Sequence, residues 1–185
     1  MSMRRARFNM GRVDWIGAES VGVPGQRTFR VMALTESTSA QMWLEKEQLQ
    51  RLAEAIARMF LEIDTDKEMA YSPTISSVEG SNPKPPNFPG SPEVEFKVGA
   101  LGLRYDPQQE LIALEAFDIE AAEGAAPELQ CLTTREQMEK LQSDSLDAIS
   151  GGRPLCPLCH TPLPEAGLPH FCPPTNGHQK LGPDD

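Results

Sequence analysis

One stretch of this sequence occurs twice and constrains the fold more than any other feature. Residues 44–56 read LEKEQLQRLAEAI, and residues 132–149 read LTTREQMEKLQSDSLDAI. The two stretches align at Glu-Gln, then Leu or Met, then any residue, then Arg or Lys, then Leu. A motif that returns once within 185 residues predicts that one supersecondary unit is repeated.

The residues ahead of the first copy predict a hairpin and a short strand. Residues 13–22 and 27–34 read as strands, and the VPGQ of residues 23–26 matches a type II turn, because proline fixes its φ and glycine accepts the positive φ that follows. Residues 40–44 read as a third, short strand. Apolar residues at three- and four-residue steps then predict a helix over residues 46–63.

The same order of elements precedes and includes the second copy. Residues 93–105 read as a strand whose apolar positions change parity at Gly99-Ala100, which predicts a β-bulge. A return strand and a short third strand follow at residues 111–119 and 129–132. Thr134 and Gln137 form a capping-box pair, which predicts that the second helix begins there.

These elements predict an α+β fold. We expect two βββα repeats, residues 8–63 and 93–150, to pack about a pseudo-twofold axis within one domain of residues 8–150. Their strands are predicted to form a mostly antiparallel sheet or an open barrel, with the helices covering it. Residues 64–92, rich in proline, glycine and serine, read as a linker between the repeats.

Residues 151–178 hold the most recognisable motif of the chain, and residues 179–185 read as a tail. The motif begins with CPLCH and continues to HFC, which places two thiols in a tight turn and a further histidine and thiol downstream. Cys156, Cys159, His170 and Cys172 make a complete tetrahedral Zn²⁺ set without an open position, so the predicted zinc is structural. His160 and His178 are competing candidates for the fourth ligand.

Two other interpretations of CPLCH, a haem attachment motif and a redox dithiol, are less favoured. The string is a C-x-x-C-H haem attachment motif, but covalent haem attachment takes place outside the bacterial cytoplasm, and the N-terminus has no secretory apolar segment. A redox dithiol is typical of a strand-to-helix junction, and this stretch is rich in proline instead. Zinc is the favoured cofactor.

Charge and hydropathy bear on the partners and the compartment. The net charge of −10 disfavours nucleic acid and anionic lipid as partners. No window has the apolar length of a membrane span, so we expect a cytoplasmic protein without a membrane partner. A protein partner is expected, and the sequence predicts no oligomeric state.

The body of the chain offers few candidates for catalysis. All three histidines lie between residues 160 and 178, and no phosphate-binding loop motif is present. Glu115 interrupts an apolar strand and is either a ligand contact or the partner of a basic side chain such as Arg104 or Arg30. Arg27, beside the glycines of the first turn, is a weak candidate for anion binding. Arg27, Arg104 and Glu115 are therefore the ligand-site candidates, and no catalytic residue is predicted.

Several segments together resemble a known family. VGVPGQRTF, LEKEQ, FKVGALGLRYD and GRPLCPLCHTPLPEAGLPHFCPPTNG are similar to the bacterial family called Domain of Unknown Function 3090. In that family the ending carries C-P-x-C, G-H-x-C and N-G, so the resemblance implies that His170, not His160, is the zinc ligand. Pro169 and His160 stand where glycines are usual. The resemblance implies no activity.

Two functions from different classes remain open at this point. The favoured one is a non-enzymatic adaptor or regulatory protein with a structural zinc site and a protein partner. The alternative is an enzyme or small-ligand-binding protein that uses a cleft between the two repeats.

Overall fold

The structure, a computed structural model, describes residues 5–23, 25–66 and 88–151. It confirms the α+β class. In the described part the elements are, in order, β1 (Phe8–Arg12), β2 (Trp15–Val21), β3 (Thr28–Leu34), β4 (Ser39–Leu44), α1 (Lys46–Asp66), β5 (Val94–Asp106), β6 (Leu111–Asp118), β7 (Leu129–Thr133) and α2 (Arg135–Ser150).

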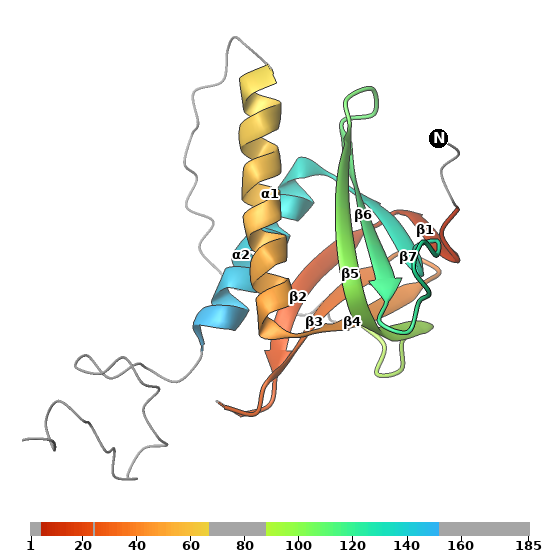
Figure 1. The fold of residues 1–185 in the computed structure, drawn as a ribbon, viewed down its shortest axis with the longest axis vertical. Helices are drawn as coiled ribbons and strands as arrows, with labels where there is room; N and C mark the ends of the chain where they lie inside the picture. The colour runs from red at the N-terminus through yellow and green to blue at the C-terminus, as the bar shows by residue number, and fades with distance from the viewer. Residues whose placement is uncertain (1–4, 24, 67–87, 152–185) are drawn as a thin grey trace, which may run out of the picture.

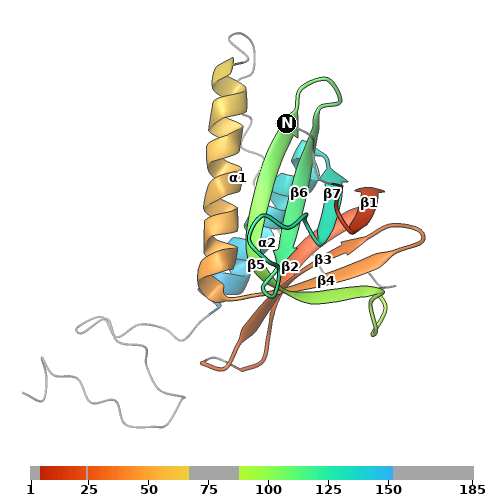
Figure 2. The same ribbon diagram turned by 45° about the vertical axis from the view of Figure 1, so that its right-hand side comes forward.

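All the strands belong to one mixed sheet in the order β1-β7-β6-β5-β4-β3-β2. Four neighbouring pairs are antiparallel, and two, β1 with β7 and β4 with β5, are parallel. The sheet curls strongly, and both helices lie on one side of it (Figures 1 and 2). The two parallel pairs join strands that are far apart in the sequence.

The chain passes from β1, at one edge of the sheet, to β2, at the opposite edge, through residues 13 and 14 alone. The N–H of Val13 donates to the carbonyl of Leu132 in β7, and the N–H of Asp14 donates to the carbonyl of Leu34 at the end of β3. β5 makes a similar change of partner. Residues 94–97 pair with β4, and residues 98–106 pair with β6.

The first strand was missed by the sequence prediction, which began the hairpin at Val13. β1 has no β-branched residue and only two alternating apolar positions, Phe8 and Met10. Its register shifts between Asn9 and Gly11, where Gly11 has a φ of 64°. Its pairing partner, β7, lies at the far end of the domain sequence. Such a strand depends on tertiary pairing more than on local propensity.

Several local predictions are confirmed. The N–H of Gln26 donates to the carbonyl of Val23 at 2.9 Å, and Gly25 has a φ of 94°, as the predicted turn requires. The register of β5 shifts between Val98 and Ala100, as the parity change predicted. Thr134 and Gln137 form the full capping box of α2.

The core forms where the helices meet the inner face of the sheet. The predicted apolar side of α1 is buried throughout: Leu49, Leu52, Ala53, Ile56, Phe60 and Ile63. Met138, Leu141 and Ala148 of α2 join the same cluster. Burial of one stripe on each helix against one sheet face explains why two amphipathic helices suffice for a single core.

The predicted linker is shorter than its assigned range of 64–92. α1 continues through residues 64–66, past the predicted helix end. At the other end Phe88 is buried, and its ring lies 6.4 Å from that of Trp15 at a tilted angle. This contact anchors the chain before it enters β5.

Candidate functional site

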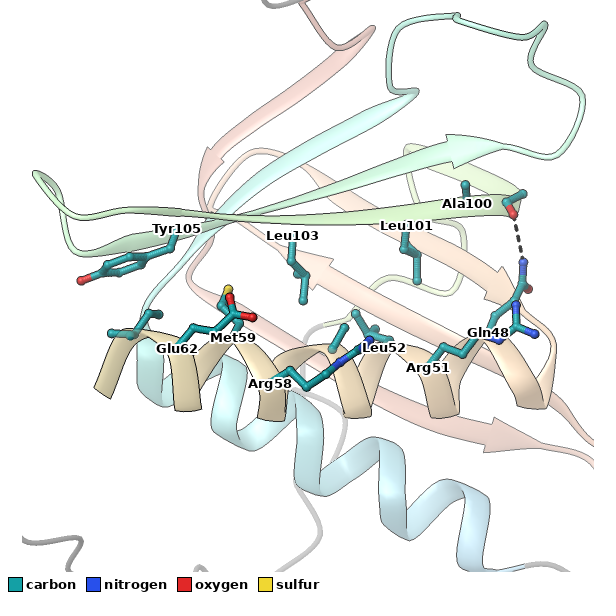
Figure 3. Close-up of a pocket in the computed structure, with 13 residues that line it drawn as sticks. Gln48, Arg51, Leu52, Arg58, Met59, Glu62, Ala100, Leu101, Leu103 and Tyr105 are labelled. Carbon is teal, nitrogen blue, oxygen red and sulfur yellow. Dashed lines mark hydrogen bonds between the residues drawn. The ribbon is translucent and has the colours of Figure 1, made fainter. Parts of the chain in front are cut away.

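A groove of about 760 Å³ lies between α1 and β5. It runs beside the part of β5 that has left β4 (Figure 3). The residues that line it are Gln48, Arg51, Leu52, Ala55, Arg58, Met59, Glu62, Ile63, Gly99, Ala100, Leu101, Leu103 and Tyr105. Its volume falls within the range typical of ligand-binding clefts.

The groove has an apolar floor. Leu101 and Leu103 point from β5 toward α1, where Leu52 and Met59 face them (Figure 3). Leu101, Leu103 and Met59 are only partly buried, although they pack against the core cluster. Apolar side chains left partly open along a groove are a feature of binding surfaces.

One rim of the groove is a charged stripe on α1. Arg51, Ala55, Arg58 and Glu62 follow one another at steps of three and four residues, so they lie along one side of the helix. Among residues 5–23, 25–66 and 88–151, neither Arg51 nor Arg58 forms an ion pair. The rim therefore presents two available guanidinium groups in a chain whose net charge is −10.

Gln48 forms one end of the groove. Its side-chain amide donates to the carbonyls of Val98 at 2.9 Å and of Gly99 at 3.3 Å, and its Oε1 accepts from the N–H of Glu45. The side chain thus ties the start of α1 to the β-bulge (Figure 3). α1 is held at this end, and the groove opens beyond it.

A smaller hollow of about 310 Å³ lies at the other end of α1 and shares Ile63 and Tyr105 with the groove. Arg135 stands in it, with a bidentate pair to Asp64 at 2.7 and 2.9 Å and a bond to Glu139 at 2.8 Å. The hydrogen bond with Asp64 is the main reason that the pKa of Arg135 is raised. Arg135 therefore links α2 to α1 through Asp64, and its guanidinium is less available to a ligand in this hollow.

Two of the predicted ligand candidates, Arg104 and Glu115, lie together. Arg104 Nη2 is 3.7 Å from Glu115 Oε1, which also accepts from Gln130 Nε2 at 3.0 Å. Arg104 alternates along β5 with the leucines of the groove floor, so this pair is on the opposite face of the sheet. The partner of Glu115 is thus Arg104, since Arg30 bonds Glu19 and Gln41 instead.

Arg27, the third candidate, lies elsewhere. A Cβ built on Gly151 would stand 2.8 Å from Arg27 Nη1, so the guanidinium sits against the C-terminal end of α2. Its Nε is buried without a hydrogen-bond partner in the described part of the chain. The structure therefore brings Arg104 and Glu115 together, and it brings neither to Arg27.

The predicted zinc ligands Cys156, Cys159, His170 and Cys172, and the alternatives His160 and His178, all lie outside the described residues. Within the described ranges no three metal-ligating side chains form a group. Neither α1 nor α2 is long and apolar enough to span a membrane.

Cys131, the one cysteine within the described residues, is fully buried in the core. Burial raises the pKa of its thiol to about 12. A thiol held in its neutral form is a poor nucleophile, so Cys131 is a packing residue of the core.

The comparison with family models identifies the chain. The family described as Protein of unknown function (DUF3090) matches residues 8–172, which is most of the sequence and includes both helices. The chain is a member of the DUF3090 family. No curated protein and no solved structure matches this DUF3090 chain. The groove must therefore be interpreted from its own residues.

The sequence did not predict which residues line this groove. Arg51 and Arg58 are charged residues on the polar side of an amphipathic helix, a side that usually faces solvent. Their spacing of seven residues was the available signal, because it places two like charges on one side of a helix. That this side borders β5 depends on how the helix packs.

Proposed function

We propose that this DUF3090 protein is a non-enzymatic adaptor or regulatory protein that binds a partner protein in the groove between α1 and β5. The observation that carries the proposal is the combination of an apolar floor with two guanidinium groups that form no ion pair in the described residues. Arginine and partly exposed apolar side chains are enriched where proteins bind one another. We place this activity in the cytoplasm.

We also propose that residues 8–63 and 93–150 are two copies of one repeat. In this repeat, β1 and β2 of the first copy together correspond to β5 of the second. Gln48 and Gln137 support it, because each occupies the third position of its helix and bonds the N–H at the helix start. The strand registers support the repeat as well. Gln41 of β4 pairs with β5 in parallel, and Gln130 of β7 pairs with β1 in parallel. We infer that the groove lies between the first repeat, through α1, and the second, through β5.

The third proposal is a structural zinc site in residues 151–178, held by Cys156, Cys159, His170 and Cys172. Support comes from the sequence alone: three thiols and an imidazole at zinc-ligand spacing, within a segment that has few apolar residues of its own. Zinc would order this segment, and the partner site remains in the groove.

A small anionic ligand is the alternative occupant. The volume of about 760 Å³ and the guanidinium groups favour this possibility. It agrees with the expectation of a cleft between the repeats, although its residues differ from Arg27, Arg104 and Glu115.

Site-specific photo-crosslinking in cells distinguishes the two occupants. Met59→benzoylphenylalanine places the crosslinker in the groove, and Leu61→benzoylphenylalanine places it on the exposed side of the same helix, where Leu61 is 69% exposed. We expect a protein adduct from position 59 that is absent from position 61. Equal adducts at both positions, or none at position 59, would contradict the proposal. A small molecule retained in native mass spectrometry of the purified protein would favour the alternative.

A further inference from the structure

We infer that the groove receives an extended peptide segment of the partner, which carries an acidic side chain and adds as a strand to residues 98–106 of β5, whose outer edge has no strand partner among the described residues. This inference rests on the proposed function and specifies the chemistry of the partner. It is carried by the edge of β5 that no described strand covers, by the groove that α1 leaves beside it and by the charge of the rim.

The edge of β5 is the first observation. Among the described residues, 98–106 pair with β6 only, because the pairing with β4 ends at Lys97. In an antiparallel pair, every second residue directs its N–H and C=O away from its partner strand. Gln48 bonds two of these outward groups, the carbonyls of Val98 and Gly99. Over residues 100–106 the outward N–H and C=O groups have no strand partner among the described residues, and such an edge is a template for an added strand.

β2 and α2, the counterparts of β5 and α1, show how closely a helix can pack on this sheet. α2 packs closely along β2, whereas α1 contacts β5 more sparsely. A Cβ built on Gly17 of β2 would lie 3.2 Å from Asp144 Oδ2 of α2, so little space remains between the two elements. At β5 the corresponding space holds the groove. α2 therefore fills the space beside β2, whereas α1 leaves a groove beside residues 99–105 of β5.

The dimensions fit a short peptide. Strands rise about 3.3 Å per residue, so the free edge over residues 100–105 offers about 20 Å, the length of roughly six extended residues. Side chains of an added strand alternate between the two faces of the sheet, and those on the inner face meet Met59 and the leucines of the floor. We expect apolar residues at every second position of the peptide.

The charge of the rim selects the peptide. Arg51 and Arg58 are seven residues apart, which corresponds to about 10 Å along a helix. An acidic side chain on the peptide can pair with either guanidinium, and Glu62 disfavours acidic residues at the far end. Nucleic acid is the poorer anion for this site, since the remainder of the chain is strongly acidic.

A phage-displayed library of random decapeptides, selected on the full-length protein, tests the inference. We expect enriched peptides with alternating apolar residues and at least one acidic residue. Their affinity should fall about tenfold or more for the double variant Arg51→Glu with Arg58→Glu, since tenfold corresponds to one good charge-assisted contact. Arg12→Glu is the matched control, because it reverses an exposed charge on β1 and should leave the affinity unchanged. Circular dichroism of each variant confirms that it is folded.

Backbone N-methylation of one enriched peptide, one position at a time, tests the strand itself. Strand addition predicts that binding is lost at every second position, because only alternate amides donate to β5. Losses of binding that do not alternate along the peptide, or a selection without acidic peptides, would overturn the inference. The crosslinking from position 59 tests the proposed function separately, so the two failures can be told apart. Adducts at position 59 to a second copy, or to another segment of the same chain, would also overturn it.

Discussion

The side-chain amide of Gln137 lies 3.0 Å from the carbonyl oxygen of Val13, and that of Gln48 lies 2.9 Å from the carbonyl oxygen of Val98. Each amide also reaches the carbonyl of the next residue, Asp14 or Gly99. Val13 and Val98 are the positions where the chain leaves a parallel partner for an antiparallel one. Each glutamine thus links the start of a helix to the position where a strand changes its pairing partner.

We predict that Gln48→Ala and Gln137→Ala each lower the free energy of unfolding by about 1–2 kcal/mol, through the lost helix cap and the carbonyls left without their donor. Urea denaturation measures the loss. Gln50→Ala is the control, because Gln50 is exposed and bonds only Glu54 within α1. Losses that match the control would show that the side-chain clamp contributes no stability.

Phe88→Ala should destabilise the domain by about 2–4 kcal/mol, because a buried ring is removed from its contact with Trp15. In a Trp43→Phe background, the emission of Trp15 should also shift to longer wavelength. Phe8→Ala, at a ring that is 36% exposed, is the comparison. If Phe88→Ala behaves like Phe8→Ala, the anchoring of the chain before β5 is contradicted.

Glu115→Gln should change the free energy of unfolding by less than about 0.5 kcal/mol, because its pair with Arg104 is long and partly exposed. The glutamine retains an acceptor for the amide of Gln130. Thermal unfolding of the variant checks this. A loss of decapeptide binding in Glu115→Gln would instead return Glu115 to the candidate ligand residues.

The thiol of Cys131 should make stability fall at alkaline pH. Its pKa is raised from 9.0 to about 12 in the folded protein, so the unfolded chain ionises first. The stability due to the neutral buried thiol is complete below pH 9.0 and is lost as the pH rises toward about 12. Between about pH 8 and about pH 10.5, the urea midpoint should fall further in the native protein than in Cys131→Ala. Equal falls would show that the thiol does not contribute.

Purified full-length protein should contain one zinc ion per chain, measured by elemental mass spectrometry. Cys156→Ser and His170→Ala should each lose most of the metal, and His160→Ala should retain it. The physical reason is that a closed tetrahedral site does not tolerate the loss of a ligand. Full zinc content in His170→Ala with loss in His160→Ala would reassign the fourth ligand.

The local predictions succeeded where a few neighbouring residues determine the backbone. Gly25 accepts a positive φ in the first turn, and Gln137 caps its own helix, so both were visible in the sequence. β1 was not visible, because its partner β7 is remote in sequence and its own five residues carry no strand pattern. Glu115 and Arg104 were candidates as charges on strands and Arg27 as a base beside turn glycines, and the structure places none of them at the groove.

The sequence by itself determined the α+β class, the order of strands and helices after β1, the capping of α2 and the apolar side of α1. Each depends on short-range geometry, which repeats along the chain with the period of a helix or a strand. Only the tertiary structure decided the parallel pairings and the difference between the two helices, of which α2 packs closely on β2 and α1 leaves a groove at β5. That difference depends on the space between packed elements, and no local pattern records it.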